Sequence, residues 1–115
     1  MNLRDEDLVT HILDAITAIQ AYVADGEKFF VADRKTQDAV IRNLEVIGEA
    51  VSKLSAGLKS GNPDVPWARI SGMRNRLIHG YLTVDLGIVW QTVERVLPDF
   101  KSRIEKIAGK SGGSS

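Results

Sequence analysis

The chain has 115 residues, with 15 lysines and arginines against 15 aspartates and glutamates, and no cysteine. A chain of this length makes one domain with a continuous core, and it is too short for separate cofactor and substrate domains. The missing cysteines exclude disulfides, thiolate zinc sites and a cysteine nucleophile, and the wide separation of His11 and His79 argues against a metal site. Because the formal charge is zero, any nucleic-acid site must be a local cluster of cations.

The start of the chain is charged, and its end is rich in glycine and serine. The charged start, Asp5-Glu6-Asp7, has no apolar signal-peptide core, and no segment approaches the roughly 20 apolar residues that span a bilayer. We therefore expect a cytoplasmic protein that makes no membrane contact. Residues 1–108 are predicted to form a single helical domain. Residues 109–115 have a Gly/Ser linker composition and are expected to be disordered, either as a native tail or as a cloning remnant.

The first half of the chain has two stretches with helical periodicity. In the first, apolar residues recur at three- and four-residue steps from Leu8 to Val23, and a stop is expected near Asp25-Gly26. The second is predicted to begin between Asp33 and Thr36. Its apolar stripe runs from Val40 to Leu58 in the 4-3-4 rhythm of a helix that packs along another helix.

The second half of the chain follows a breaker run at residues 59–64. A third helix is predicted from about Pro66 to His79 and is closed by Gly80. Thr83 or Asp85 caps a fourth helix, which Pro98 should kink or divide, giving a fifth short helix. No stretch alternates as a strand does, so the chain is predicted to be all-α. Short connections between amphipathic helices favour an up-and-down four-helix bundle.

The end of the third predicted helix has polar residues that packing alone does not explain. Ser71, Asn75 and His79 follow one another at i,i+4 spacing, and Arg74 and Arg76 flank them. His79 belongs to the last turn, where the helix dipole favours an imidazolium. A protonatable histidine beside arginines can handle a phosphate group.

Cleavage of RNA by its own 2′-hydroxyl matches this set of residues. That reaction needs a base for the 2′-hydroxyl, an acid for the leaving 5′-oxygen, and cations to stabilise the charge at phosphorus. One histidine cannot fill both proton-transfer roles at once. A symmetric dimer would supply two, because each protomer lends one His79 and one Arg74 to a shared site.

A structural interpretation of the same residues stays open. Histidine near a helix C-terminus is a common stabilising cap, arginines on a helix usually form a solvated face, and a tyrosine after a glycine cap often packs on the turn. A structural role predicts that His79→Ala changes only stability, and by a small amount.

Two segments of the sequence resemble a known family. Residues 74–81, Arg-Asn-Arg-Leu-Ile-His-Gly-Tyr, are similar to the Arg-x4-His-x-Tyr motif of the HepT-like toxins, within the larger HEPN group of all-α domains. Residues 41–50 are similar to the family's second-helix signature, and residues 67–75 to its approach to the motif. The resemblance covers most of the chain, and the motif residues are all present.

The resemblance implies a specific function. HepT-like proteins are the toxins of type II toxin-antitoxin pairs, and they are metal-independent endoribonucleases with a cleft at a homodimer interface. By position, Arg74 would hold the scissile phosphate, His79 would act as general acid and base, and Asn75 would orient the reacting groups. The partner would be a minimal nucleotidyltransferase antitoxin that transfers AMP from ATP to Tyr81, adding negative charge and bulk that repel RNA. No cofactor is implied for the toxin itself.

Other residues have weaker functional interpretations. Arg76, Arg69 and Arg42 could extend a phosphate track, although a surface role suits each as well. Glu45 and Glu49 could be paired carboxylates or line a dimer cleft, but helical spacing favours ion pairs with Arg42 and Lys53. His11 is expected to be structural. The aromatic residues Phe29, Phe30, Trp67 and Trp90 are expected in the core or an interface rather than as a platform for bases.

Two functions from different classes remain at this stage. The first is a dimeric ribonuclease. The second is a non-catalytic module of the HEPN type that binds a nucleotide or a partner protein through Arg74, Asn75 and His79. A titratable group at the helix end favours the first function, because a binding module does not need one.

Overall fold

A computed structural model describes the backbone of residues 1–79 and 85–111, and the side chains of residues 1–73 and 85–109. These residues form helices and connecting turns, with no strand among them. The all-α prediction is confirmed. The elements are α1 (Leu3–Tyr22), α2 (Glu27–Ala32), α3 (Arg34–Lys53), α4 (Ala56–Ser60), α5 (Trp67–His79), α6 (Leu86–Gln91), the π-helical turn η1 (Thr92–Val96) and α7 (Leu97–Ser111).

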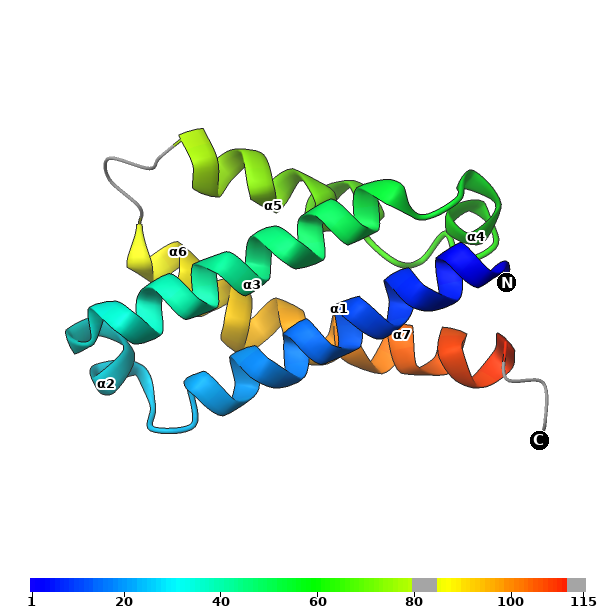
Figure 1. Ribbon diagram of the computed structural model, residues 1–115. Coiled ribbons are helices and arrows are strands. Elements are labelled where there is room, and N and C mark those ends of the chain that lie inside the picture. The colour runs from blue at the N-terminus through cyan, green and yellow to red at the C-terminus, as the bar shows by residue number, and fades with distance from the viewer. Residues whose placement is uncertain (80–84, 112–115) are drawn as a thin grey trace.

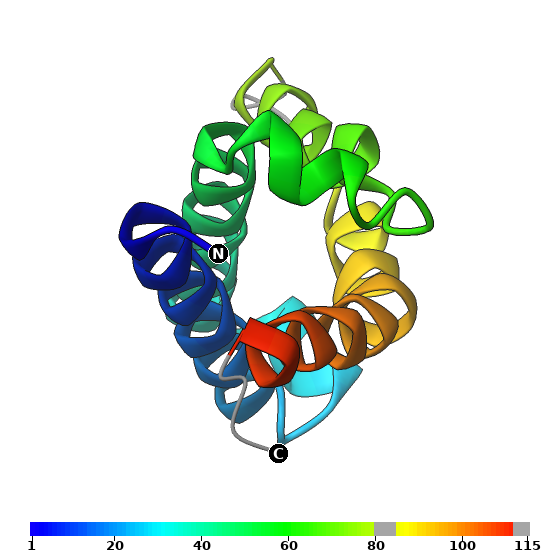
Figure 2. The ribbon, with the colours of Figure 1, turned by 90° about the vertical axis from the view of Figure 1, so that its right-hand side faces the viewer.

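The long helices α1, α3, α5 and α7 run alternately up and down, as Figure 1 shows. In the end-on view of Figure 2 they form a ring in which α3 lies between α1 and α5, and α7 closes the ring beside α1. The predicted up-and-down arrangement of four long helices is therefore correct. The motif helix α5 is held against α3, which is in turn the most extensive neighbour of α1.

Apolar stripes from all four long helices meet in one core. Its fully buried side chains include Ile16, Leu44, Ile70 and Ile104, one from each long helix. Each stripe follows the three- and four-residue spacing that places side chains on a single face of a helix. Burial of these faces against one another fixes the rotation of every long helix about its axis.

The second predicted helix is shorter than expected. Its apolar stripe predicts a helix as far as Leu58, but α3 ends at Lys53. Leu54 and Ser55 adopt extended backbone angles before the short helix α4. Ser55 caps α4, since its Oγ accepts a hydrogen bond from the Leu58 N–H at 3.2 Å. The Asp5 carboxylate in α1 accepts from the Ser55 N–H at 3.0 Å and from its hydroxyl at 2.6 Å. The contact with Asp5, 50 positions earlier in the chain, thus stabilises the interruption between α3 and α4. Helical periodicity could not have predicted this interruption.

Helix α2 was not predicted, because its six residues are too few for a periodic signal. Gly26 begins it with φ of 93°, a conformation that glycine adopts without strain. The Gln37 side chain donates to the backbone carbonyls of Phe30 and Val31 and so ties α2 to α3. Phe30 is fully buried and Phe29 is half-exposed, so of these two aromatics, which were predicted for the core or an interface, Phe30 is the one in the core.

The expected interruption at Pro98 takes a different form. The π-helical turn η1 comes first, in which the Leu97 N–H donates to the Thr92 carbonyl. Pro98 then occupies the first turn of α7, where its missing N–H costs little. The predicted fifth short helix after Pro98 is absent, because α7 continues for 15 residues.

The helical domain was predicted to end at residue 108, which is three residues too early. Helix α7 extends to Ser111, into the segment expected to be disordered from residue 109. Ile107 is buried and Ala108 packs on the core, and each further residue of a formed helix adds a backbone hydrogen bond. The expectation for residues 112–115 lies outside the described residues. In the part of the chain that is described, no helix is long and apolar enough to cross a membrane.

Candidate active site

Helix α5 carries the polar segment that the sequence singles out. It spans Trp67–His79, as predicted from the Pro66 start and the position of His79. Ile70 and Met73 are buried, so the predicted apolar face of this helix is confirmed as far as its side chains are described. Helical geometry places positions 75 and 79 on roughly the opposite side of α5 from Ile70 and Met73.

Several predicted site residues have side chains outside the described part of the structure. These are Arg74, Asn75, Arg76 and His79, whose backbone belongs to the last two turns of α5, and Tyr81, which follows the helix. The expected stop at Gly80 and the alternative cap at Thr83 are also outside it. The roles assigned to these residues therefore stay predictions.

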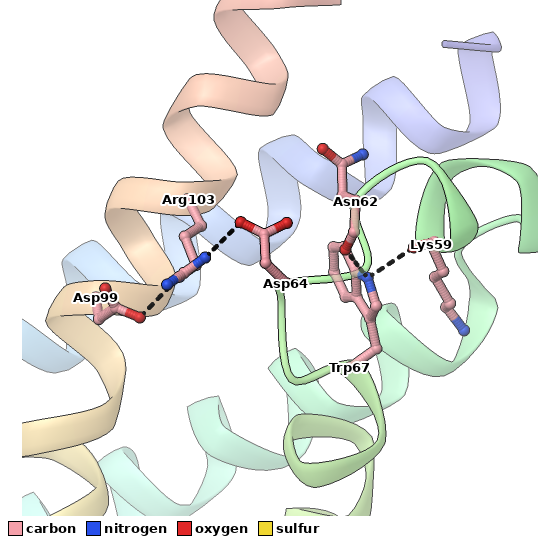
Figure 3. Close-up of polar contacts among 6 residues, drawn as sticks. All are labelled: Lys59, Asn62, Asp64, Trp67, Asp99 and Arg103. Atoms are coloured by element: carbon pink, nitrogen blue, oxygen red, sulfur yellow. Dashed lines mark hydrogen bonds and ion pairs between the residues drawn. The ribbon is translucent and has the colours of Figure 1, made fainter.

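The first turn of α5 is anchored by Trp67, as Figure 3 shows. Its indole N–H donates to the backbone carbonyls of Asn62 at 3.0 Å and Lys59 at 3.2 Å. Its ring lies edge-on to Phe100 of α7, with centroids 6.3 Å apart. Trp67 thus links the start of the motif helix to two other parts of the bundle, and its packing is structural.

A second anchor lies just before α5. Arg103 of α7 donates to Asp64 at 2.8 Å and to Asp99 at 2.9 Å, so its guanidinium bridges two carboxylates (Figure 3). The hydrogen bond and the charge of Asp99, with a further contribution from Asp64, raise the pKa of Arg103 above its ordinary value. Sequence reasoning missed this role, because Arg103 and Asp64 are 39 positions apart and no local pattern joins them.

The chain re-enters the described structure at Asp85, which caps α6. Its carboxylate accepts hydrogen bonds from the N–H groups of Gly87 and Ile88, so one of the two predicted caps of this helix is confirmed. Farther along α6, the Trp90 ring packs against Phe30 with centroids 5.6 Å apart, and its N–H donates to Glu94. This contact makes Trp90 part of the aromatic packing around the core.

The remaining charged candidates are distributed over two helices. Arg69 is exposed on α5. Arg42 lies on α3, where its guanidinium pairs with Glu45 at 3.8 Å, and Lys53 pairs with Glu49 at 3.3 Å. The predicted ion pairs along this helix are therefore confirmed.

The charged residues of α3 line a groove between α3 and α1, which has a volume of about 300 Å³. Besides Arg42, Glu45, Glu49 and Lys53, its lining consists of Leu8, His11, Val46 and Ala50. His11, which was expected to be structural, is exposed in this groove. Within residues whose side chains are described, no three histidine, cysteine or acidic side chains are grouped as a metal site would require.

Comparison with known proteins gives the family. A family model described as "Ribonuclease HepT-like" matches residues 12–107. The chain belongs to the HepT-like ribonuclease family. The match runs from α1 through α7 and includes the whole of the polar segment in α5.

Individual HepT-like relatives agree with the family match. A protein of Thermococcus cleftensis named "Probable ribonuclease HepT" is 37% identical over 108 residues, which cover 93% of this chain and 98% of that protein. A Methanocaldococcus jannaschii protein, named as a gamma-glutamylcyclotransferase and candidate RNase, is 39% identical over 86% of this chain, but only 45% of its own length is matched. A second protein of that organism, named as a candidate RNase, is 42% identical over 68% of this chain and 67% of its own length. No solved structure gives a significant match.

Proposed function

We propose that this chain is the toxin of a type II toxin-antitoxin pair and that it cleaves RNA as a metal-independent endoribonuclease. The observation that carries the proposal is the match of a ribonuclease family model over residues 12–107. That range contains Arg74, Asn75 and His79, the residue types that cleavage through the 2′-hydroxyl requires. The names of three relatives, which include ribonuclease or RNase, support the same activity.

The proposed reaction uses two copies of the chain. The His79 imidazole of one copy takes the proton of the 2′-hydroxyl, and the 2′-oxygen attacks the adjacent phosphorus. The bond from phosphorus to the 5′-oxygen breaks, and that oxygen receives a proton from the imidazolium of the second His79. The products are a 2′,3′-cyclic phosphate and a free 5′-hydroxyl, with no net proton consumed.

The other site residues assist this reaction. Arg74 stabilises the charge that accumulates on the phosphoryl oxygens, and Asn75 orients the attacked phosphate through hydrogen bonds. Arg76, Arg69 and Arg42 contribute weaker contacts to the RNA backbone. The site works in the cytoplasm and needs no cofactor.

We propose that the antitoxin neutralises this chain by modifying Tyr81. A minimal nucleotidyltransferase antitoxin would bind ATP, and the Tyr81 oxygen would attack the α-phosphorus so that pyrophosphate leaves. The AMP group then adds a negative charge two residues from His79, which repels the RNA backbone.

The experiment that tests the activity is cleavage of total cellular RNA by purified protein in excess EDTA. Intact mass first establishes that Tyr81 carries no AMP. The wild type should leave 2′,3′-cyclic phosphate ends, and His79→Ala and Arg74→Ala should each lose at least about a hundredfold in rate. Arg95→Ala, an exposed arginine on η1, is the matched control and should keep full activity.

Two results would overturn the proposal. If the unmodified wild type cleaves no RNA but binds a nucleotide, the chain is the non-catalytic module instead. If cleavage persists in His79→Ala with an unchanged pH profile, the assignment of His79 is wrong. For the regulatory step, Tyr81→Phe should take up no AMP from ATP and the antitoxin, whereas the wild type takes up one AMP per chain.

A further inference from the structure

The motif helix α5 is supported differently at its two ends. Within the described residues, α3 is the long helix that packs extensively along α5. The ring contact and the hydrogen bond that join α7 to this region both lie at the start of α5, where Trp67 meets Phe100 and Arg103 binds Asp64 (Figure 3). The residues of the proposed chemistry belong to the last two turns. Most of the helix therefore separates this support from the proposed site.

We infer that Arg103 is a positioning residue for the proposed site, because by holding Asp64 it sets the tilt of α5 and with it the place of Arg74 and His79. The crossing angles of packed helices scatter by about 15–20° around their preferred values, so packing on α3 alone leaves the tilt of α5 underdetermined. A contact with a further helix, α7, removes this freedom.

Arg103 is held in place for this role by its own helix. Its Nε donates to Asp99 at 2.9 Å, one turn earlier in α7, and its Nη1 donates to Asp64 at 2.8 Å. The side chain of Arg103 is 34% exposed, against 75% for Asp64. Because the guanidinium is planar and rigid, a hydrogen bond at Nε limits the directions in which Nη1 can point. Arg103 thus gives Asp64 a fixed point of attachment on α7.

The turn between Asp64 and α5 is short and stiff. Val65 is buried, and its N–H donates to the Asn62 carbonyl at 3.2 Å. Pro66 has a fixed φ, and its carbonyl accepts from the Ile70 N–H of α5 at 3.1 Å. A displacement of Asp64 is therefore passed to the first turn of α5 and is not absorbed by a flexible loop.

A small tilt at the start of α5 becomes a large displacement at its end. The helix has 13 residues, which makes it about 20 Å long. A tilt of about 5° thus moves the last turn by about 1.7 Å. Where reacting groups must be aligned, a misplacement of about 1 Å can lower the rate about a hundredfold. The proposed reaction uses His79 from two copies of the chain, so a change of tilt displaces two reacting groups.

The bond between Arg103 and Asp64 contributes little to stability. The Asp64 side chain is largely exposed, and ion pairs at exposed positions have a small effect on the free energy of unfolding. Loss of the pair should change Tm by less than about 5 °C. An effect on position can therefore be separated from an effect on stability.

The inference rests on the proposed ribonuclease function, and its first test is kinetic. Asp64→Asn removes the charge and keeps the shape of the side chain, and Arg103→Gln removes the guanidinium. Each should lower kcat for RNA cleavage by at least about tenfold and leave KM within about twofold, because the reacting groups are displaced. The double variant should have a kcat within about twofold of either single variant, since both substitutions break one bond. Glu105→Gln, at an exposed carboxylate of α7, is the matched control and should keep the wild-type kcat.

Amide chemical shifts give a second test that does not depend on catalysis. In Asp64→Asn, a tilt of the whole helix should shift the backbone amide signals of residues 74–79 as well as those near the substitution. A local structural role of the bond would confine these shifts to residues 59–70. Asp64→Glu keeps the charge-assisted bond and should restore kcat to within about threefold of the wild type.

The inference is wrong if Asp64→Asn and Arg103→Gln keep the wild-type kcat, or if the amide shifts are confined to residues 59–70. A fall in Tm of more than about 10 °C in both variants would also contradict it, because the bond would then hold the fold and not the tilt. If the unmodified wild type cleaves no RNA, the proposed function fails, and the amide shifts still decide whether Arg103 sets the position of α5.

Discussion

Replacement of Asp5 by alanine should destabilise the fold strongly, although Asp5 lies in the first turn of the first helix. Its side chain is 2% exposed, and the carboxylate accepts hydrogen bonds from both the N–H and the hydroxyl of Ser55. Hydrogen bonds to a charged group contribute about 1.5–3 kcal/mol net, and a carboxylate at a helix N-terminus adds about 0.3–1 kcal/mol. Asp5→Ala should therefore lower the free energy of unfolding by about 2–4 kcal/mol.

Urea denaturation followed by circular dichroism measures this loss. For a domain of this size, a loss of about 2–4 kcal/mol in the free energy of unfolding corresponds to a fall in Tm of about 8–16 °C. Asp7→Ala is the matched control, because Asp7 is an exposed carboxylate only two residues farther along α1. Ser55→Ala and the double variant complete a cycle, in which a coupling of about 1–2 kcal/mol is expected between the two residues. A loss for Asp5→Ala within about 0.5 kcal/mol of that for Asp7→Ala would refute the reasoning.

The remaining predictions concern the aromatic side chains. Phe30→Ala should cost about 3–5 kcal/mol because Phe30 is fully buried, whereas Phe29→Ala, at a side chain 45% exposed, should cost less than about 1 kcal/mol. Equal losses from thermal unfolding would contradict the placement of this pair. Trp67→Phe keeps an aromatic ring against Phe100 but removes the donor to two carbonyls, so it should cost about 1 kcal/mol and speed amide hydrogen exchange in the first turn of α5. Unchanged exchange there would mean that Trp67 does not anchor the motif helix.

The candidate site could be proposed from the sequence because its residues are close together in the chain. Arg74, Asn75, His79 and Tyr81 fall within eight positions, and helical spacing alone relates the first three. The pairing of Arg42 with Glu45 was predicted for the same reason, since residues three or four apart in a helix are neighbours. Local spacing therefore gave the motif helix, its limits and its polar residues.

What anchors the motif helix could not be predicted in this way. The hydrogen bond from Arg103 to Asp64 depends on α7 lying beside the turn before α5, and Asp5 meets Ser55 only because α1 begins next to α4. A single sequence contains no signal for pairs 39 or 50 positions apart. These contacts exist because the apolar faces bring the helices together, and that packing is a property of the whole chain.

The sequence by itself determined the all-α class, the up-and-down order of the long helices, and the segment that carries the polar motif, because hydrophobic periodicity and helix caps are local properties. Only the tertiary structure decided where α3 breaks, that the π turn η1 precedes Pro98, and that Arg42, Glu45, Glu49 and Lys53 of α3 border a groove against α1. The break in α3, the π turn and the groove all depend on which side of each helix is covered by its neighbours. Long-range packing settles that choice, because a helix with apolar residues at its edges can be buried at more than one rotation about its axis.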